Sequence, residues 1–318
     1  MTGEIRTPQR LTYSAVIPTK DRPEHAAAAV GLLLDQHRRP EEIVVVDASA
    51  RRYEPSQDLV AQAEHHGVEL VVVQSRASTS AQRNVGARRV ASDLVLFLDD
   101  DVRVPPEYAA ALVHRWEAAG EAAYGGMAGT PAVVPRQPPG GRFLRRIAML
   151  NYVDPSAPAM TLRRSGNVRY VPEPRGPVAV PALGAGATLF RRDLALASPF
   201  DERFEGYAPG EDLDMAWRVG QIAPLIQTPE VKWTHLWDPR ERSSPSRWRT
   251  RGRCETYFRL RRLDRSPVTM AAFGVSLVAE AGVALGESIR EHDPRHVRGF
   301  VSGTVESLLG RPASHASR

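Results

Sequence analysis

Short apolar runs alternate with helix-forming stretches through the first hundred residues, and this alternation restricts the fold more than any other feature. Four runs rich in Val, Ile and Leu each stop at a polar residue, a proline or a charge. The runs are 13–18, 42–47, 68–74 and 94–98, and the helix-forming stretches are 24–37, 57–66 and 80–90. Buried parallel strands joined by helices produce this pattern. We therefore expect an α/β fold with a Rossmann-like, mainly parallel sheet flanked by helices.

Carboxylates follow three of these four runs. Asp21 lies in the loop after the first run, Asp47 ends the second, and Asp99, Asp100 and Asp101 come directly after the fourth. In sheets of this kind ligands bind outside the carboxyl ends of the strands. Acidic residues also occur there simply as solvated loop starts, and this alternative stays open for Asp21 and Asp47 taken singly. The set together predicts a binding site at one edge of the sheet.

The aspartate triplet predicts a divalent cation. Three adjacent carboxylates repel one another unless a cation or other positive groups offset their charge. Mg²⁺ and Mn²⁺ prefer oxygen ligands and share their coordination with substrate phosphates. Because alternate residues of an extended chain point the same way, we expect Asp99 and Asp101 on one side and Asp100 on the other. The expected cofactor is Mn²⁺ or Mg²⁺.

Composition limits the compartment and the partners. With 318 residues and 42% hydrophobic content the chain can bury a full core, and its single cysteine, Cys254, cannot form an intramolecular disulfide. A cytoplasmic location is expected. The net charge of +5 is almost wholly arginine, since Lys20 and Lys232 are the two lysines. Arginine suits phosphate contacts, and no nucleic-acid recognition motif is evident, so anionic small molecules or lipids are expected and nucleic acid is not.

The second half contains a proline-rich segment and two further candidate sites. Residues 135–181 contain too many prolines for long regular elements, apart from one expected helix at 143–152. The segment is either a mobile lid over an acceptor or an ordered surface excursion. Glu211 and Asp212 follow Gly210 at the start of a predicted helix, where helix capping is the alternative explanation. A predicted strand at 231–235 ends in His235.

Taken in order, these pieces resemble a known family. The matching motifs are Val-Ile-Pro-Thr at 16–19 with Asp21-Arg22, Val-Val-Val-Asp at 44–47, Ala-Gln-Arg-Asn at 81–84, Phe-Leu-Asp-Asp-Asp at 97–101, Gly-Ala-Gly at 184–186, Gly-Glu-Asp at 210–212 and Trp-Thr-His at 233–235. The chain resembles the family 2 glycosyltransferases, which have the GT-A fold. The order and spacing of these motifs make the resemblance specific over about residues 13–237.

The resemblance implies donor-binding roles for six residues, which are Thr19, Asp21, Asp47, Arg83, Asp99 and Asp100. By this resemblance Asp47 and Arg83 contact the nucleoside, Asp21 lies near its base, and Thr19 lines its pocket. Asp99 and Asp100 would face the donor sugar and ribose.

The resemblance also implies a metal site and a catalytic base. Asp101 and His235 would hold the metal on the diphosphate, with Asp99 as a further candidate ligand. Asp212 would be the general base, because a sugar hydroxyl needs a carboxylate to accept its proton. Glu211 beside it would orient the acceptor or tune the base.

Four segments are expected along the chain. They are a loose lead-in at 1–12, a nucleotide-sugar-binding half at 13–104, an acceptor-binding half at 105–239 that includes the proline-rich insertion, and an arginine-rich helical extension at 240–318. Residues 240–265 contain ten arginines, suited to a diphosphate or an anionic lipid headgroup, or simply to a solvated helix face. The apolar stretch 268–286 is expected as a buried or interfacial helix, with a membrane span as the alternative. Peripheral contact with the inner face of the membrane is compatible with these features.

The predicted function is inverting, metal-dependent transfer of one sugar from a UDP- or dTDP-linked donor to an acceptor hydroxyl. A lipid-linked sugar, a natural product or another small molecule would be the acceptor. One rival is a sugar nucleotidyltransferase, which needs a glycine-rich loop that residues 16–22 lack. Another rival is a non-catalytic binding module on the same scaffold. Ser244 replaces the Gln of the processive synthases' Gln-x-x-Arg-Trp motif, which argues against a polymerase.

Overall fold

The computed structural model describes residues 10–133, 139–171, 173–204, 209–236 and 245–310. Its strands are β1 Tyr13–Thr19, β2 Glu42–Asp47, β3 Glu69–Gln74, β4 Leu94–Leu98, β5 Val102–Arg103, β6 Gly126–Pro131, β7 Tyr152–Val153, β8 Thr161–Leu162, β9 Val168–Tyr170, β10 Val178–Val180, β11 Ala187–Arg191 and β12 Leu225–His235. Its helices are α1 Pro23–Leu34, α2 Gln57–His65, α3 Thr79–Arg89, α4 Tyr108–Ala119, a 3₁₀ turn η1 Glu121–Ala123, α5 Pro139–Ile147, α6 Arg192–Ala197, α7 Glu211–Gly220, α8 Pro245–Arg262, α9 Pro267–Arg290 and α10 Arg295–Leu308.

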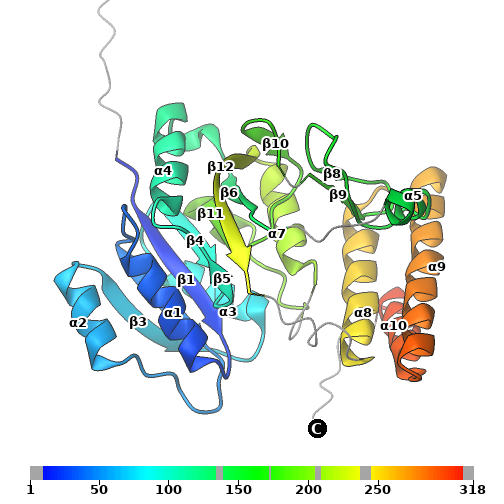
Figure 1. Cartoon of the computed structure of the whole chain (residues 1–318), viewed down its shortest axis with the longest axis horizontal. Helices are drawn as coiled ribbons and strands as arrows, with labels where there is room; N and C mark the ends of the chain where they lie inside the picture. The colour runs from blue at the N-terminus through cyan, green and yellow to red at the C-terminus, as the bar shows by residue number, and fades with distance from the viewer. Residues whose placement is uncertain (1–9, 134–138, 172, 205–208, 237–244, 311–318) are drawn as a thin grey trace, which may run out of the picture.

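The central sheet runs through both halves of the chain (Figure 1). Its strand order is β10-β12-β6-β11-β4-β1-β2-β3, and β5 pairs with the far end of β12. Strands β1 to β4 are parallel, as are β6 and β12, whereas β11 runs antiparallel between β4 and β6. The expected α/β fold with a mainly parallel sheet is confirmed. Because β4 pairs with β11, the two expected halves share one sheet.

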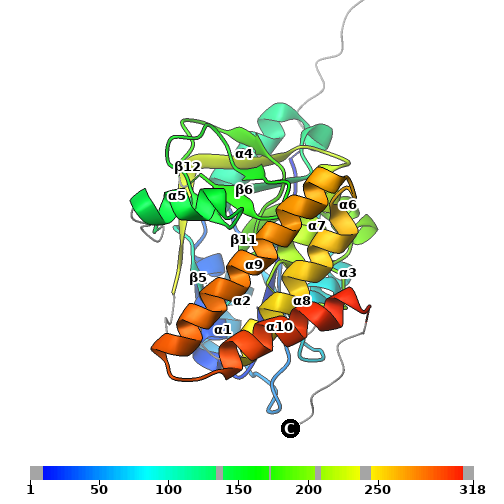
Figure 2. The same cartoon turned by 90° about the vertical axis from the view of Figure 1, so that its right-hand side faces the viewer.

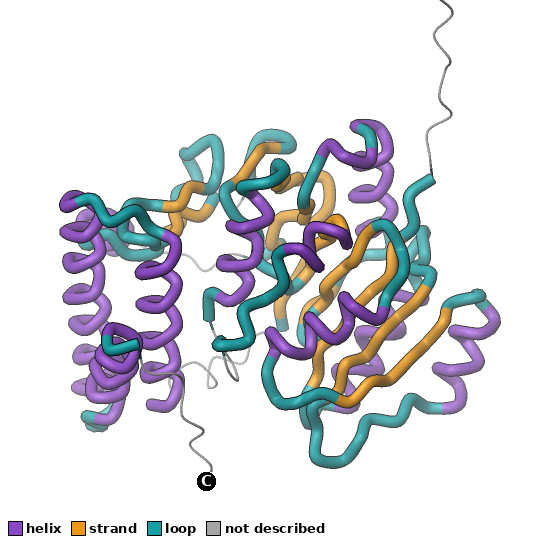
Figure 3. The backbone as a smooth tube through the Cα atoms, turned by 180° about the vertical axis from the view of Figure 1, so that it is seen from behind, coloured by secondary structure: helices purple, strands orange, loops and turns teal. Residues whose placement is uncertain are grey.

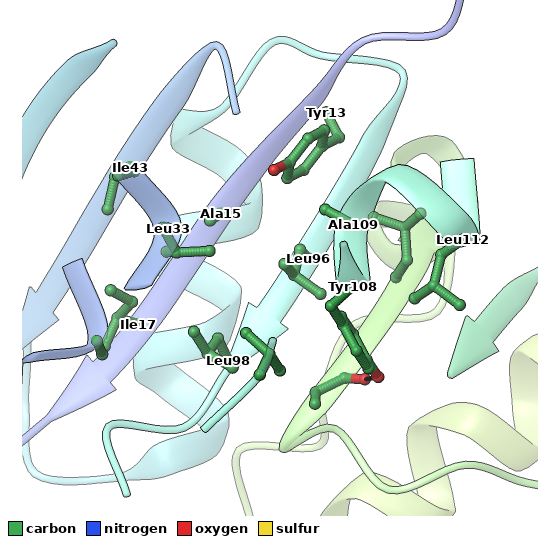
Figure 4. Close-up of a cluster of buried hydrophobic side chains, with 14 of the residues drawn as sticks. Tyr13, Ala15, Ile17, Leu33, Ile43, Leu96, Leu98, Tyr108, Ala109 and Leu112 are labelled. Carbon is green, nitrogen blue, oxygen red and sulfur yellow. Dashed lines mark hydrogen bonds between the residues drawn. The ribbon is translucent and has the colours of Figure 1, made fainter. Parts of the chain in front are cut away.

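Alternation along the buried strands sends side chains to two separate cores. Ala15 and Ile17 of β1 and Leu96 and Leu98 of β4 face the core under α1 and α4, as Figure 4 shows. Their neighbours in sequence, which include Val16 and Phe97, face the second core under α3, α6 and α7. Strands with both faces covered by helices read as continuous apolar runs. This explains why the sequence pattern alone located them.

Close packing of α3 on β1 brings its first turn to the edge where the strands end. A Cβ on Gly86 would lie 2.2 Å from the Val16 side chain, so only glycine allows this approach. One turn earlier, the amide of Gln82 donates to the carbonyl oxygens of Thr19 (2.8 Å) and Val46 (2.7 Å). These two bonds attach the start of α3 to the ends of β1 and β2. Arg83, the next residue, is therefore held at the same edge.

The proline-rich segment is ordered over its described residues. Its helix is α5, Pro139–Ile147, so the expected helix at 143–152 is wrong by about one turn. Proline is favoured in the first turn of a helix, because the N–H that it lacks has no intrahelical partner there. At the other end Arg163 donates to the carbonyl oxygen of Arg146 (2.6 Å) and closes the last turn. A small sheet of β7, β9 and β8 follows, so these parts form an ordered surface excursion.

Helices α8, α9 and α10 lie together at the end of the molecule opposite β3 (Figures 2 and 3). Arg251 of α8 forms an ion pair with Glu280 of α9 (2.9 Å), and Arg259 donates to Asn167 beside β9 (2.7 Å). These contacts tie the helices to one another and to the excursion. Of the helices that the structure describes, α9 is long and apolar enough to cross a membrane, with a mean hydropathy of 1.8.

Candidate active site

The ends of β1 and β4 meet through a hydrogen bond between predicted site residues. The hydroxyl of Thr19, the last residue of β1, donates to Asp100 Oδ2 (2.7 Å). Arg22, in the following loop, reaches Asp100 (3.4 Å) and Asp101 (3.2 Å). Burial raises the pKa of Asp100, while the Thr19 hydroxyl and the Arg22 charge oppose the rise. The structure thus places positive charge directly on two members of the triplet.

The triplet lies in a turn between β4 and β5, and the pairing of its side chains differs from the expected one. The N–H of Val102 donates to the carbonyl of Asp99 (3.1 Å), which closes this turn. Asp100 and Asp101 share Arg22, whereas Asp99 binds Arg83 (2.6 Å). The grouping of Asp99 with Asp101 was therefore wrong, because strict alternation holds for extended strands and not for a tight turn.

Arg83 joins the triplet to the acidic pair on α7. Its guanidinium is buried and donates to Asp99 and to Glu211. Phe200 covers the guanidinium, with its ring centre 5.3 Å away. Burial raises the pKa of Glu211 to about 7, with Arg83 opposing the rise and Asp212 adding to it. One buried cation therefore connects two acidic groups that are far apart in sequence.

Asp212, rather than Glu211, has a carboxylate available to a substrate. Glu211 is 7% exposed, and its two oxygens accept from Arg83 and from the Ser80 hydroxyl (3.3 Å). Asp212 is half-buried and accepts from the N–H of Leu213 (2.8 Å). Burial raises the pKa of Asp212, and Arg83 opposes the rise. A partly exposed carboxylate with a raised pKa has the properties of a general base.

The Gly-Ala-Gly motif lets the backbone approach both acidic groups. A Cβ on Gly184 would lie 3.3 Å from Asp212 Oδ2, and one on Gly186 would lie 3.1 Å from Asp99 Oδ2. The N–H of Asp99 also donates to the carbonyl of Gly186 (2.9 Å). The strand that begins just after this motif, β11, is the one that separates β4 from β6. Residues 184–186 therefore pack directly against the carboxylates of Asp99 and Asp212.

His235 reaches the triplet through strand pairing. The end of β12 pairs with β5, with Thr234 opposite Arg103 and His235 opposite Val102. This places His235 Nε2 3.5 Å from Asp101 Oδ1, and both side chains are partly exposed. Carboxylate and imidazole groups are both common ligands of divalent metal ions. Among the described residues no group of three His, Cys, Asp or Glu side chains is arranged for a metal. Asp101 and His235 lie together as candidate ligands, whereas Asp99 lies apart on Arg83.

Asp47 and Asp21 organise the loop that follows β2. Asp47 is fully buried, and its carboxylate accepts from Ser49, from the N–H of Tyr53 (2.7 Å) and from Gln74 (2.7 Å). Burial acts against its ionisation, but these hydrogen bonds outweigh burial and lower its pKa. Asp21 is exposed, has a φ of 55°, and donates from its N–H to the Ser49 hydroxyl (2.7 Å). The nucleoside contacts predicted for Asp21, Asp47 and Arg83 stay predictions, since the structure shows protein partners for all three.

Two functional contributors were not assigned from the sequence. Arg22 was quoted within a motif but received no role, although it forms ion pairs with both Asp100 and Asp101. Ser80, which hydrogen-bonds Glu211, precedes the Ala-Gln-Arg-Asn motif by one residue. A basic residue in the loop after the first strand, opposite an acidic triplet on a neighbouring strand, was an available signal for Arg22. No comparable signal pointed to Ser80.

Comparison with known proteins supplies the remaining evidence. Residues 14–168 match the family model described as glycosyl transferase family 2. No curated protein matches the chain in sequence.

Solved structures share the fold at low identity. GalNAc-T7 with UDP, GalNAc and Mn²⁺ aligns with a TM-score of 0.55 and 16% identity. The alignment covers 71% of this chain and 43% of the GalNAc-T7 chain, so this chain spans under half of that protein. The mannosyltransferase PcManGT from Pyrobaculum calidifontis, with GDP-Man and Mn²⁺, aligns at 0.54 and 14%, covering 95% and 88%. TarS 1-349 from S. aureus aligns at 0.51 and 15%, covering 95% and 92%.

Proposed function

Because this chain belongs to glycosyltransferase family 2 through residues 14–168 and has the GT-A fold, we propose that it transfers a single sugar from a nucleotide-sugar donor to an acceptor hydroxyl, with inversion and with help from a divalent cation. One observation carries the proposal. At a single edge of the sheet the half-buried Asp212 lies within an acidic cluster that Arg83 joins to Asp99, and Asp101 pairs there with His235.

Asp212 is proposed as the base. It would accept the proton of the acceptor hydroxyl while the acceptor oxygen bonds to the anomeric carbon of the donor. The bond from that carbon to the diphosphate oxygen breaks, and its electron pair leaves with the nucleoside diphosphate. Attack from the face opposite the leaving group inverts the anomeric centre. Glu211 is held by Arg83 and Ser80, which suits a residue that tunes and positions its neighbour Asp212.

Asp101 and His235 are proposed as the residues that hold Mn²⁺ or Mg²⁺. Their 3.5 Å separation and partial exposure support this assignment. When bound, the cation supplies positive charge that stabilises the leaving diphosphate. Arg22 offsets one of the two negative charges of Asp100 and Asp101, so part of the charge of the triplet is compensated without a metal. The assignment rests on the carboxylate and imidazole pair.

The donor proposal is a UDP- or dTDP-linked sugar. Two similar structures hold UDP or GDP-Man together with Mn²⁺, so a GDP-linked sugar belongs in the same test. Thermal shift with UDP-, dTDP- and GDP-sugars, with and without MnCl₂, would identify the class. We expect a Mn²⁺-dependent shift with one class, and its loss in Asp101→Ala and His235→Ala. An unchanged Mn²⁺ dependence in both variants would argue against this ligand pair.

Asp212→Asn tests the base. We expect transfer to fall by roughly 10²–10⁴-fold while donor binding is retained, since the amide cannot accept the proton. Asp58→Asn, which alters an exposed carboxylate on α2, is the matched control and should keep full activity. Retained turnover in Asp212→Asn would contradict the assignment of Asp212 as the base. Release of pyrophosphate from a nucleoside triphosphate and a sugar phosphate would instead indicate a nucleotidyltransferase.

A further inference from the structure

The outward side of α9 lacks charge over most of its length. Residues 267–286 include a single charged residue, Glu280, and it is buried. The exposed large side chains at helical spacing are Val275 (50% exposed), Val278 (75%), Leu285 (49%) and Ile289 (67%). Ala271 and Gly282 lie exposed on the same side. A helix on the surface of a protein in water normally places its polar face outward, so α9 is reversed.

Two polar groups in the middle of α9 are turned inward. Glu280 pairs with Arg251 of α8, and Ser276 is fully buried. Ala284 packs in a cluster with Trp248 of α8 and Phe300 of α10. The ion pair and this cluster bind α9 along its length to the rest of the protein. Such a helix is built to lie on a surface, because crossing a bilayer would strip Glu280 of its partner.

Helix α5 carries a second group of exposed apolar side chains. Phe143 (62% exposed), Leu144 (66%) and Ile147 (59%) are exposed on it. Figures 1 and 2 place α5 beside α9 at the same end of the molecule. Burial raises the pKa of Glu280, and the charge of Arg145 on α5 is among the positive charges that oppose the rise. We call the combined surface the outer apolar face, defined by Phe143, Leu144, Ile147, Val275, Val278, Leu285 and Ile289.

Exposed arginines lie on or next to the helices that carry the outer apolar face. Arg146 lies on α5, Arg265 precedes α9, and Arg298 lies on α10, all of them exposed. Among the ion pairs of the described residues none involves these three arginines, whereas Arg290 and Arg295, near Ile289, pair with Glu287, Glu291 and Asp293. Residues 139–147 contain three arginines and no acidic residue. Apolar side chains edged by arginine complement an anionic lipid surface.

We propose that the outer apolar face docks on a bilayer that contains anionic lipid, with α5 and α9 lying in the headgroup region. A second copy of this chain fits less well, because it would bring two sets of unpaired arginines together. The proposal is independent of the donor and of the reaction, since it rests on surfaces outside the acidic site. It also gives a physical reason for the exposed apolar side chains of α9, since their exposure to water is unfavourable.

Cosedimentation with vesicles tests the proposal. Wild-type protein should bind phosphatidylcholine vesicles weakly and bind vesicles containing phosphatidylglycerol strongly, with release at high salt. Val278→Glu combined with Leu285→Glu should lower the partition coefficient by roughly tenfold or more. Arg146→Gln combined with Arg265→Gln should lower it by roughly 25-fold, about fivefold for each arginine.

The matched control is Val60→Glu on α2, at the opposite end of the molecule in Figure 1, which should bind vesicles like the wild type. Thermal melts monitored by circular dichroism establish that each variant is folded, and Arg146→Gln with Arg265→Gln, two exposed polar changes, keeps the test valid if the Glu pair misfolds. No binding by the wild type at any phosphatidylglycerol fraction would overturn the proposal. A solution dimer that Val278→Glu with Leu285→Glu abolishes, without vesicle binding, would assign the face to a second copy instead.

Discussion

Replacing Arg83 with Met removes the buried cation between Asp99 and Glu211, and we expect it to lower the free energy of unfolding by about 3–5 kcal/mol near pH 8. The magnitude follows from burial. The side chains of Arg83 and Glu211 are 3% and 9% exposed, so water cannot replace the lost cation. Methionine keeps much of the volume under Phe200, which limits the contribution of packing. Most of the loss then comes from leaving a buried carboxylate without its partner.

The loss should depend on pH. Burial already raises the pKa of Glu211 to about 7, and removing Arg83, which opposes that rise, raises it further. Folding then takes up a proton between the ordinary Glu pKa and this raised value, so stability falls as pH rises through that window. Each further unit of pKa adds about 1.4 kcal/mol of pH-dependent loss. The gap between wild type and variant should therefore be smaller near pH 5.5 than near pH 8.

Urea unfolding of wild type, Arg83→Met, Glu211→Gln and the double variant at both pH values measures these terms. At the higher pH the double variant should be more stable than Arg83→Met alone by about 1–3 kcal/mol, because no unpaired carboxylate remains at position 211. Arg83→Lys is the control that keeps one charge but cannot bridge two carboxylates. An equal loss at both pH values, or a double variant as unstable as the sum of the single changes, would refute the reasoning.

Three further predictions concern groups around the site. Asp47→Asn should lower the free energy of unfolding by about 1–3 kcal/mol at neutral pH. Because the pKa of Asp47 is lowered in the folded protein, the difference between wild type and variant should vanish as acid protonates Asp47 below about pH 4. Urea unfolding at both pH values would measure this. Gly186→Ala should press on Asp99 and lower kcat roughly tenfold with little change in melting temperature. Arg262→Gln should leave the fully buried Asp214 without a bidentate partner (2.5 and 3.0 Å) and cost about 2–4 kcal/mol, with Arg262→Lys recovering part in a thermal melt.

Strands β1, β2 and β4 could be predicted from the sequence because burial on both faces leaves a continuous apolar run. Strand β2 was predicted with its bounds at 42–47, and β4 with its bounds at 94–98. The one helix expected in the proline-rich segment was displaced, because Arg163, a residue beyond the helix, determines where it ends. Local patterns do not encode such contacts.

The site was predictable as a set of residues and not as a set of contacts. Periodicity indicated that acidic groups gather at one edge, and it could not show that Arg22 would hold Asp100 and Asp101 or that Arg83 would bridge Asp99 to Glu211. Those pairings join residues separated by up to 128 positions. They depend on how α3 and α7 pack on the sheet, which emerges only with the fold.

The short pairing between β5 and β12 should respond to ligand binding. Two residue pairs and one further bond, from the N–H of Leu236 to the carbonyl of Asp101 (2.8 Å), hold His235 beside Asp101. Opening so few bonds costs far less than unfolding the sheet. A ligand that requires both side chains would bind the closed ladder and slow its opening in proportion to occupancy. The amide hydrogen of Leu236 thus becomes a reporter, exchanging quickly in the protein alone and slowly once cation and donor are bound.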